Sequence, residues 1–400
     1  MSATRRQHQA MRADAGAIQV GLDPWMLVPA MLLAAFGLVM VGSASIAVAE
    51  GLGVSSFHYL WRHVLYLVMG VILASSFRII PISFLERICR PMMLLAALCL
   101  LLVFVPGLGH TVNGSSRWIR LGLLNFQVVE AAKLMVIIYM AGYLVRKSQL
   151  IRTRFFDTLK PLLLAGILSA ILLMQPDMGS AAVICAVVGG MIWLAGAAWR
   201  HIMVLLMVAL PAFTWAAMEP YRLRRIISFT NPWADPYDSG FQLTQALIAV
   251  GRGELFGVGV GASIQKLFYL PEAHTDFIFA VVAEEFGLFG VVLVLGLFLL
   301  LITRIMSTGM MAHRAGRPFA GNLAFGVGLW IGLQALVSIG VNLGVLPTKG
   351  LTLPLISSGG SSLLMTCLAL GMVLRIRFEL DSEAVGPVRQ RPAVRRGARA

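Results

Sequence analysis

The stretch LPEAHTDFIFAVVAEEFG, residues 270–287, begins with Glu272, His274 and Asp276 and continues as an apolar run that contains two adjacent glutamates. Ionisable side chains are costly to place in hydrocarbon, and inside membrane segments they mark functional sites by default. The stretch therefore predicts a membrane-spanning helix with a group of acids and bases at its start.

The composition of the whole chain agrees with a membrane environment. Of 400 residues, 58% are hydrophobic and 12% are charged, and the mean hydropathy is +0.85, which excludes a soluble globular protein. The four cysteines lack the spacing of a metal site or a disulfide framework, so we expect them to be core residues. The chain is predicted to be an all-α polytopic membrane protein.

Apolar windows of about 20 residues predict ten transmembrane helices. Pro176 and Asp177 interrupt a long apolar run between the fifth and the sixth, which favours a tight hairpin over one continuous helix. The first span, starting near Trp25, lies too far from the amino terminus for a cleaved signal peptide and is expected to remain. The predicted spans are 25–47, 59–77, 91–105, 124–145, 161–176, 179–197, 201–219, 276–303, 321–345 and 357–375.

Basic residues set the predicted orientation, because Lys and Arg flanking a span are retained in the cytoplasm. Placing both termini in the cytoplasm puts 22 of the 32 Lys and Arg inside. The predicted domains are a basic cytoplasmic segment (1–24), a membrane domain (25–378) and a disordered basic cytoplasmic tail (379–400). The net charge of +14 thus reflects topology and contact with membrane lipid, and a nucleic-acid partner is not expected.

The same topology places one long loop, about 220–275, on the outer face between helices 7 and 8. Residues 231–240 have the Pro, Asp, Asn and Gly of consecutive turns, whereas 241–250 predict a short amphipathic helix at the interface. Three glycines then keep the backbone permissive, namely Gly257, Gly259 and Gly261.

Other ionisable residues are expected on the outer side. Arg62, at the outer end of the second span, either binds a ligand or reaches the interface beside Trp61. Glu130 and Lys133 are three residues apart in the fourth span, where they serve a functional site or form a structural ion pair. Lys349 lies in a segment rich in Pro, Gly and Ser, which suits either anion binding or a plain polar loop.

Five blocks of this sequence resemble signatures of the SEDS family of membrane glycosyltransferases (shape, elongation, division and sporulation), and the resemblance covers residues 25–378. The division branch is more similar than the elongation branch. Two motifs depart from the family pattern, FQVVE at the fourth span and SSGGSS before the last one. The resembling blocks are LPEAHTDFIFAVVAEEFG, NPWADPYDSGFQLTQALIAVGRGELFGVGVGASIQKLFYLPE, NGSSRWIRLGLLNFQ, QPDMGSA and LPTKGLTLPLISSGGSSLL.

The resemblance implies a peptidoglycan glycosyltransferase that polymerises lipid II into glycan strands at the division septum of the bacterial inner membrane. It also implies a class B penicillin-binding protein as the crosslinking partner, together with other division proteins. Asp276 is the residue that the resemblance identifies as catalytic. Alternatives are an elongation-type polymerase, a lipid II flippase and a scaffold without activity.

A general base suits this reaction, because the attacking sugar hydroxyl must lose a proton during inverting transfer. Asp276 would be that base, although it could instead only cap the following helix. Cations would stabilise the leaving diphosphate, and Mg or Mn could bridge it, with no tightly bound cofactor expected. Glu284 and Glu285, more than about 10 Å further along the helix, would be structural or gating groups that anchor the loop or another span. The predicted substrate-binding residues are Arg62, Arg117, Glu130, Lys133, His274 and Lys349.

Overall fold

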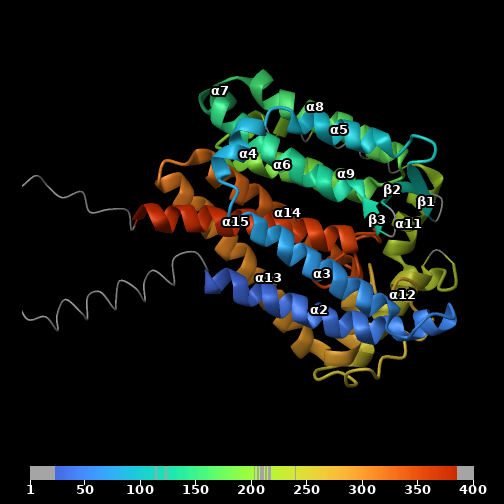
Figure 1. The fold of residues 1–400 in the computed structure, drawn as a ribbon. Helices are drawn as coiled ribbons and strands as arrows, with labels where there is room; N and C mark the ends of the chain where they lie inside the picture. Colours follow the sequence, from blue (N-terminus) through green and yellow to red (C-terminus); the bar gives the residue numbers. More distant parts are fainter. Residues whose placement is uncertain are drawn as a thin grey trace, which may run out of the picture.

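The structure, a computed structural model, consists mainly of long helices packed side by side (Figure 1). It describes residues 23–384 except 113–114, 122–123, 202, 205–206, 208–210, 212–213, 215–217 and 239. The helices are α2 (Pro24–Gly51), α3 (His58–Ser76), α4 (Ile82–Ile88), α5 (Met92–Leu102), α6 (Val128–Arg146), α7 (Ser148–Thr153), α8 (Phe155–Met174), α9 (Met178–Leu194), α11 (Pro220–Thr230), α12 (Phe241–Gly253), α13 (Ile278–Arg314), α14 (Pro318–Asn342) and α15 (Gly360–Ala384), with a short 3-10 helix η1 (Pro232–Ala234).

The length and hydropathy of its helices identify the chain as a multi-pass membrane protein. Within the described residues, six helices are long and apolar enough to cross a membrane: α2, α3, α6, α8, α13 and α14. The helices α5 and α9 are apolar but shorter. The seventh predicted span, 201–219, lies largely outside the described residues.

The prediction of an all-α protein is wrong between α5 and α6. Strands β1 (Gly109–Val112), β2 (Ser115–Leu121) and β3 (Leu124–Gln127) form an antiparallel sheet in the order β1-β2-β3. Consequently α6 begins at Val128, later than the predicted start at residue 124. Hydropathy windows average over such a short strand, so they cannot separate it from the first turn of a helix.

The hairpin between α8 and α9 is confirmed. The Asp177 carboxylate accepts hydrogen bonds from the Ser180 amide at 3.0 Å and from the Ser180 hydroxyl at 2.8 Å, so it caps the start of α9. Gln175 donates to the carbonyl of Leu100 at 2.8 Å and joins the turn to α5.

The helix α13, which contains most of the predicted span 276–303, is kinked at Gly287. Gly287 has φ +62°, which breaks the helical hydrogen-bond pattern and frees backbone groups on both sides. The loop after α12 satisfies these groups: Val258 N–H donates to Glu284 O at 3.0 Å, and Leu288 N–H donates to Glu254 O at 2.9 Å.

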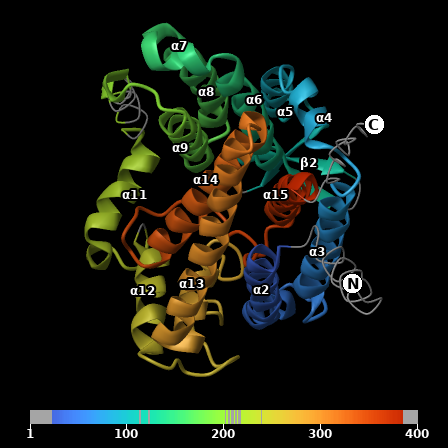
Figure 2. The same cartoon turned by 90° about the vertical axis from the view of Figure 1, so that its left-hand side faces the viewer.

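The loop 220–275 is partly helical and packs on the bundle. The predicted helix at 241–250 is present as α12, and it buries Leu243, Ala246 and Ala249 as it packs against α13 (Figure 2). The three glycines that follow all have positive φ, as expected. Gly257 also lies so close to the carbonyl of Glu285 that a Cβ would collide with it.

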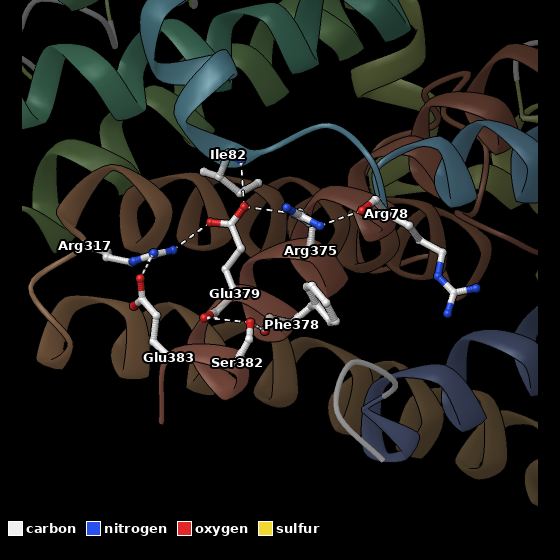
Figure 3. Close-up of polar contacts among 8 residues, drawn as sticks. All are labelled: Arg78, Ile82, Arg317, Arg375, Phe378, Glu379, Ser382 and Glu383. Carbon is white, nitrogen blue, oxygen red and sulfur yellow. Dashed lines mark hydrogen bonds and ion pairs between the residues drawn. The ribbon is translucent and has the colours of Figure 1, made fainter. Parts of the chain in front are cut away.

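The start of α2 and the end of α15 lie at the same end of the bundle as the turn between α13 and α14. Arg304 Nε is 2.6 Å from Asp23 Oδ2, and Arg317 Nη1 is 2.6 Å from Glu379 Oε2. Because α15 continues to Ala384 and Glu379 is ion-paired, the predicted tail boundary at residue 379 lies too early in the chain (Figure 3).

Candidate active site

The segment 345–359, between α14 and α15, is non-helical and enters the helix bundle. Its residues Leu353, Leu355 and Ile356 are buried. Gly37 of α2 permits this path, because a Cβ at Gly37 would lie only 2.6 Å from the carbonyl oxygen of Leu355. The segment is therefore a packed part of the protein and differs from the plain polar loop considered above.

Asp276 is held at the start of α13 by Asn342, the last residue of α14. Asn342 Nδ2 donates to the Asp276 carbonyl at 2.9 Å, and its Oδ1 accepts from Ala280 N–H at 2.9 Å. The N-cap of α13 is Phe277, one residue after Asp276. The half-buried Asp276 carboxylate faces Gly350, where a Cβ would lie 3.0 Å from Oδ2.

The two residues before Asp276 bind the same 345–359 segment. Ser358 N–H donates to the His274 carbonyl at 3.0 Å, and Ser357 Oγ donates to the Thr275 carbonyl at 2.7 Å. The His274 ring packs on Tyr59 of α3, with 4.8 Å between ring centroids. Burial lowers the pKa of His274 below its ordinary value, and the charge of Glu272 opposes that shift.

Lys349 precedes Gly350, so the segment brings a cation next to the residue that contacts Asp276. Its half-buried side chain extends toward the start of α9, where Nζ lies 3.5 Å from Met178 Sδ. The 345–359 segment thus brings Lys349 close to the stretch 274–276, which carries His274 and Asp276.

Glu130 and Lys133 form a buried ion pair at 2.8 Å, with side chains 4% and 2% exposed. Lys133 Nζ also donates to Gln334 Oε1 at 2.8 Å and lies 5.4 Å from the Trp330 ring centroid. Gln334 in turn donates to the carbonyl of Thr352 at 3.0 Å. The pair therefore reaches the 345–359 segment through Gln334.

The two arginines predicted to bind substrate are placed differently. Arg117, in β2, donates to the carbonyls of Gln175 at 3.1 Å and Pro176 at 2.5 Å, which ties the sheet to the α8–α9 turn. Arg62 is half-buried in α3, three residues after Tyr59, and its neighbour Trp61 is 69% exposed, as expected of a residue in the interface belt.

Glu284 and Glu285 anchor the long loop, as predicted. Glu284, fully buried, accepts hydrogen bonds from Arg252 at 2.9 Å and from Ser263 Oγ at 2.5 Å. Glu285 pairs with Lys266 at 2.7 Å.

Glu285 also joins the long loop to a second span, α2. Ser43 Oγ of α2 donates to the Glu285 carboxylate at 2.7 Å and accepts from Lys266 Nζ at 2.8 Å. The loop, α13 and α2 thus share one buried polar cluster.

Sequence reasoning missed Asn342 and Gln334, the two side chains of α14 that hold the site together. Both are almost completely buried, with 0% and 1% exposure. Their signal was available, because isolated amides in an apolar helix are expected to face the interior of a bundle and bond across helices. Among the described residues, no group of three His, Cys, Asp or Glu side chains is placed to hold a metal ion.

Residues 24–382 match the family model FTSW_RODA_SPOVE, described as "Cell cycle protein". The chain belongs to the SEDS family. A SEDS relative from Xanthomonas oryzae, named probable peptidoglycan glycosyltransferase FtsW, is 50% identical over 374 residues, which cover 93% of this chain and 76% of that protein. A relative of the same name from Coxiella burnetii is 49% identical over 361 residues, covering 90% and 97%.

Solved structures of SEDS proteins have the same fold. A chain of a peptidoglycan synthase complex, solved to show how polymerization and crosslinking are coordinated, aligns with a TM-score of 0.72 and 30% identity over 90% of this chain and 98% of that chain. The rod shape determining protein RodA of Thermus thermophilus aligns with a TM-score of 0.64 and 29% identity over 90% and 97%.

Proposed function

We propose that this SEDS protein is a peptidoglycan glycosyltransferase of the FtsW type, which polymerises lipid II into glycan strands. Relatives of that name, about half identical over most of the chain, support the activity. The observation that carries the mechanism is the half-buried Asp276 carboxylate facing Gly350, beside Lys349.

Asp276 is the general base of this proposal. The acceptor sugar hydroxyl attacks the anomeric carbon of the donor, its proton passes to the carboxylate, and the bond from that carbon to the diphosphate oxygen breaks with inversion. A rigid position is needed, because a small displacement of a base costs a large factor in rate. Asn342 and the 345–359 segment provide that rigidity through the contacts around residues 274–276.

Lys349 stabilises the charge of the leaving diphosphate, because it is a half-buried cation on the stretch that contacts Asp276. Lys133 is a positioning residue in this proposal, since it is almost completely buried and already bonded to Glu130 and Gln334. Arg62 contacts the substrate headgroup from α3. A divalent cation bound with the diphosphate would be held near the Asp276 carboxylate, and it would supply positive charge to the leaving group.

The proposed topology has ten membrane-spanning helices, both termini in the cytoplasm and the site at the outer face of the inner membrane. Lipid II then reaches Asp276 from the outer leaflet. The division septum is the proposed place of action. A class B penicillin-binding protein is the proposed partner, in line with the synthase complex that this fold resembles, and other division proteins regulate the pair.

Polymerisation of labelled lipid II by the purified protein in detergent, with and without the class B partner, tests the function. We expect glycan polymer in detergent, where no bilayer separates two leaflets. A flippase would instead move headgroups across a bilayer and leave lipid II unpolymerised in detergent, and that result would contradict the proposal.

A further inference from the structure

A cavity of about 450 Å³ lies between α2, α3 and α15. The helix α3 lies beside both α2 and α15 (Figures 1 and 2). The walls are formed by apolar side chains such as Ala30, Leu67 and Leu370. Met31 and Val71, which also line it, are 59% and 54% exposed, so the cavity opens on the lipid-facing surface.

The charged residues that line this cavity are two arginines, Arg78 and Arg375. Arg375 is fixed, because Nη1 donates to the Arg78 carbonyl at 2.6 Å and Nε donates to Glu379 at 2.9 Å (Figure 3). Glu379 also binds Arg317 at 2.6 Å, so its charge is shared between two cations. The Arg78 guanidinium extends away from this cluster (Figure 3).

The cavity also reaches the segment that supports Asp276. Leu355 lines it, and the backbone of Leu355 lies against Gly37 of α2. Two residues later, Ser357 holds the carbonyl of Thr275. An occupant of the cavity would therefore touch both the arginines and the underside of the 345–359 segment.

We propose that this cavity binds an anionic glycerophospholipid, with its phosphate at Arg78 and Arg375 and an acyl chain along the apolar walls. Two cations without a lining acid attract a phosphate, and the apolar opening toward lipid suits a chain. The end segments of this protein are unsuitable occupants, because residues 1–22 hold three Arg and one Asp, and residues 385–400 hold five Arg and no acid. In the proposed function, the diphosphate of a lipid-linked sugar binds beside Asp276, next to the start of α13, and not in this cavity.

Native mass spectrometry of the full-length protein tests this site without any need for polymerase activity. The protein is equilibrated in detergent with equal amounts of phosphatidylglycerol and phosphatidylethanolamine that have identical acyl chains. We expect one phosphatidylglycerol to be retained in preference. Arg78→Gln should bind it about fivefold more weakly, whereas Arg78→Lys should keep the preference. Both variants keep the backbone carbonyl of residue 78, to which Arg375 donates a hydrogen bond.

Two further variants separate the site from general attraction. Arg87, exposed in α4 near the same end, does not line the cavity, so Arg87→Gln should bind phosphatidylglycerol like the unmodified protein. Ala34→Phe fills the apolar part and keeps both arginines, so it should lose the bound lipid. Equal retention of the two lipids, or equal effects of Arg78→Gln and Arg87→Gln, would overturn the proposal. Undiminished binding by Ala34→Phe would also overturn it, by showing that the arginines bind phosphate alone.

Discussion

Asp276 and Gly350 approach each other so closely that a Cβ at position 350 would lie 3.0 Å from Asp276 Oδ2. Gly350 is exposed and is absent from the glycines with positive φ, so its backbone conformation does not require glycine. Glycine at position 350 therefore leaves the space that the Asp276 carboxylate occupies.

Gly350→Ala should lower lipid II polymerisation roughly tenfold, because the added methyl group displaces the carboxylate by a few tenths of an ångström. Thermal unfolding should change little, since position 350 is exposed. Gly189→Ala in α9 is the matched control, because nothing lies within 4 Å of the added Cβ. If Gly350→Ala polymerised lipid II at the unmodified rate, the close contact between Asp276 and residue 350 would have no role in catalysis.

Lys266→Met should destabilise the protein by about 3–5 kcal/mol, because it leaves the buried Glu285 carboxylate without its cation. Arg252→Gln should cost only about 1 kcal/mol, since the Arg252 side chain is 39% exposed. Glu284 also keeps its bonds to Ser263 and Ile264 in that variant. Thermal unfolding in detergent measures the stability of both variants. Equal losses of stability would contradict the larger effect expected for Lys266→Met.

Several features of the fold were predictable because they depend on local chemistry. Asp177 follows a proline and precedes an apolar run, which is enough to place the α8–α9 hairpin. The positive φ of Gly257 and Gly259 follows from glycine-rich sequence in a loop. Asp276, in contrast, was identified through the resemblance of its sequence block to the SEDS family, because local chemistry alone favoured a helix cap.

Other features were hidden because they depend on contacts between distant parts of the chain. The kink at Gly287 is stable only because the loop after α12 satisfies the freed backbone groups. The role of Gln334 needs both Lys133 and Thr352, which come together only in the fold. A sequence pattern shows that such amides are buried, but not which groups they join.

Glu130→Ala and Lys133→Ala should each cost about 3–5 kcal/mol of stability, because each leaves a buried charge unpaired. The double variant should regain much of that stability. It should nevertheless polymerise poorly, since Gln334 loses the Lys133 ammonium that orients it toward Thr352. Stability and polymerisation are measured on all three variants. A stable and fully active double variant would reduce the pair to a structural contact.

The most direct test of the central claim is lipid II polymerisation by Asp276→Asn, assayed in detergent together with the class B partner. The asparagine amide has the size of the aspartate carboxylate but is not basic, so it cannot accept the proton of the sugar hydroxyl. We predict unchanged thermal unfolding and partner binding with no detectable glycan polymer. Polymer formed at the rate of the unmodified protein would contradict the assignment of Asp276 as the catalytic base.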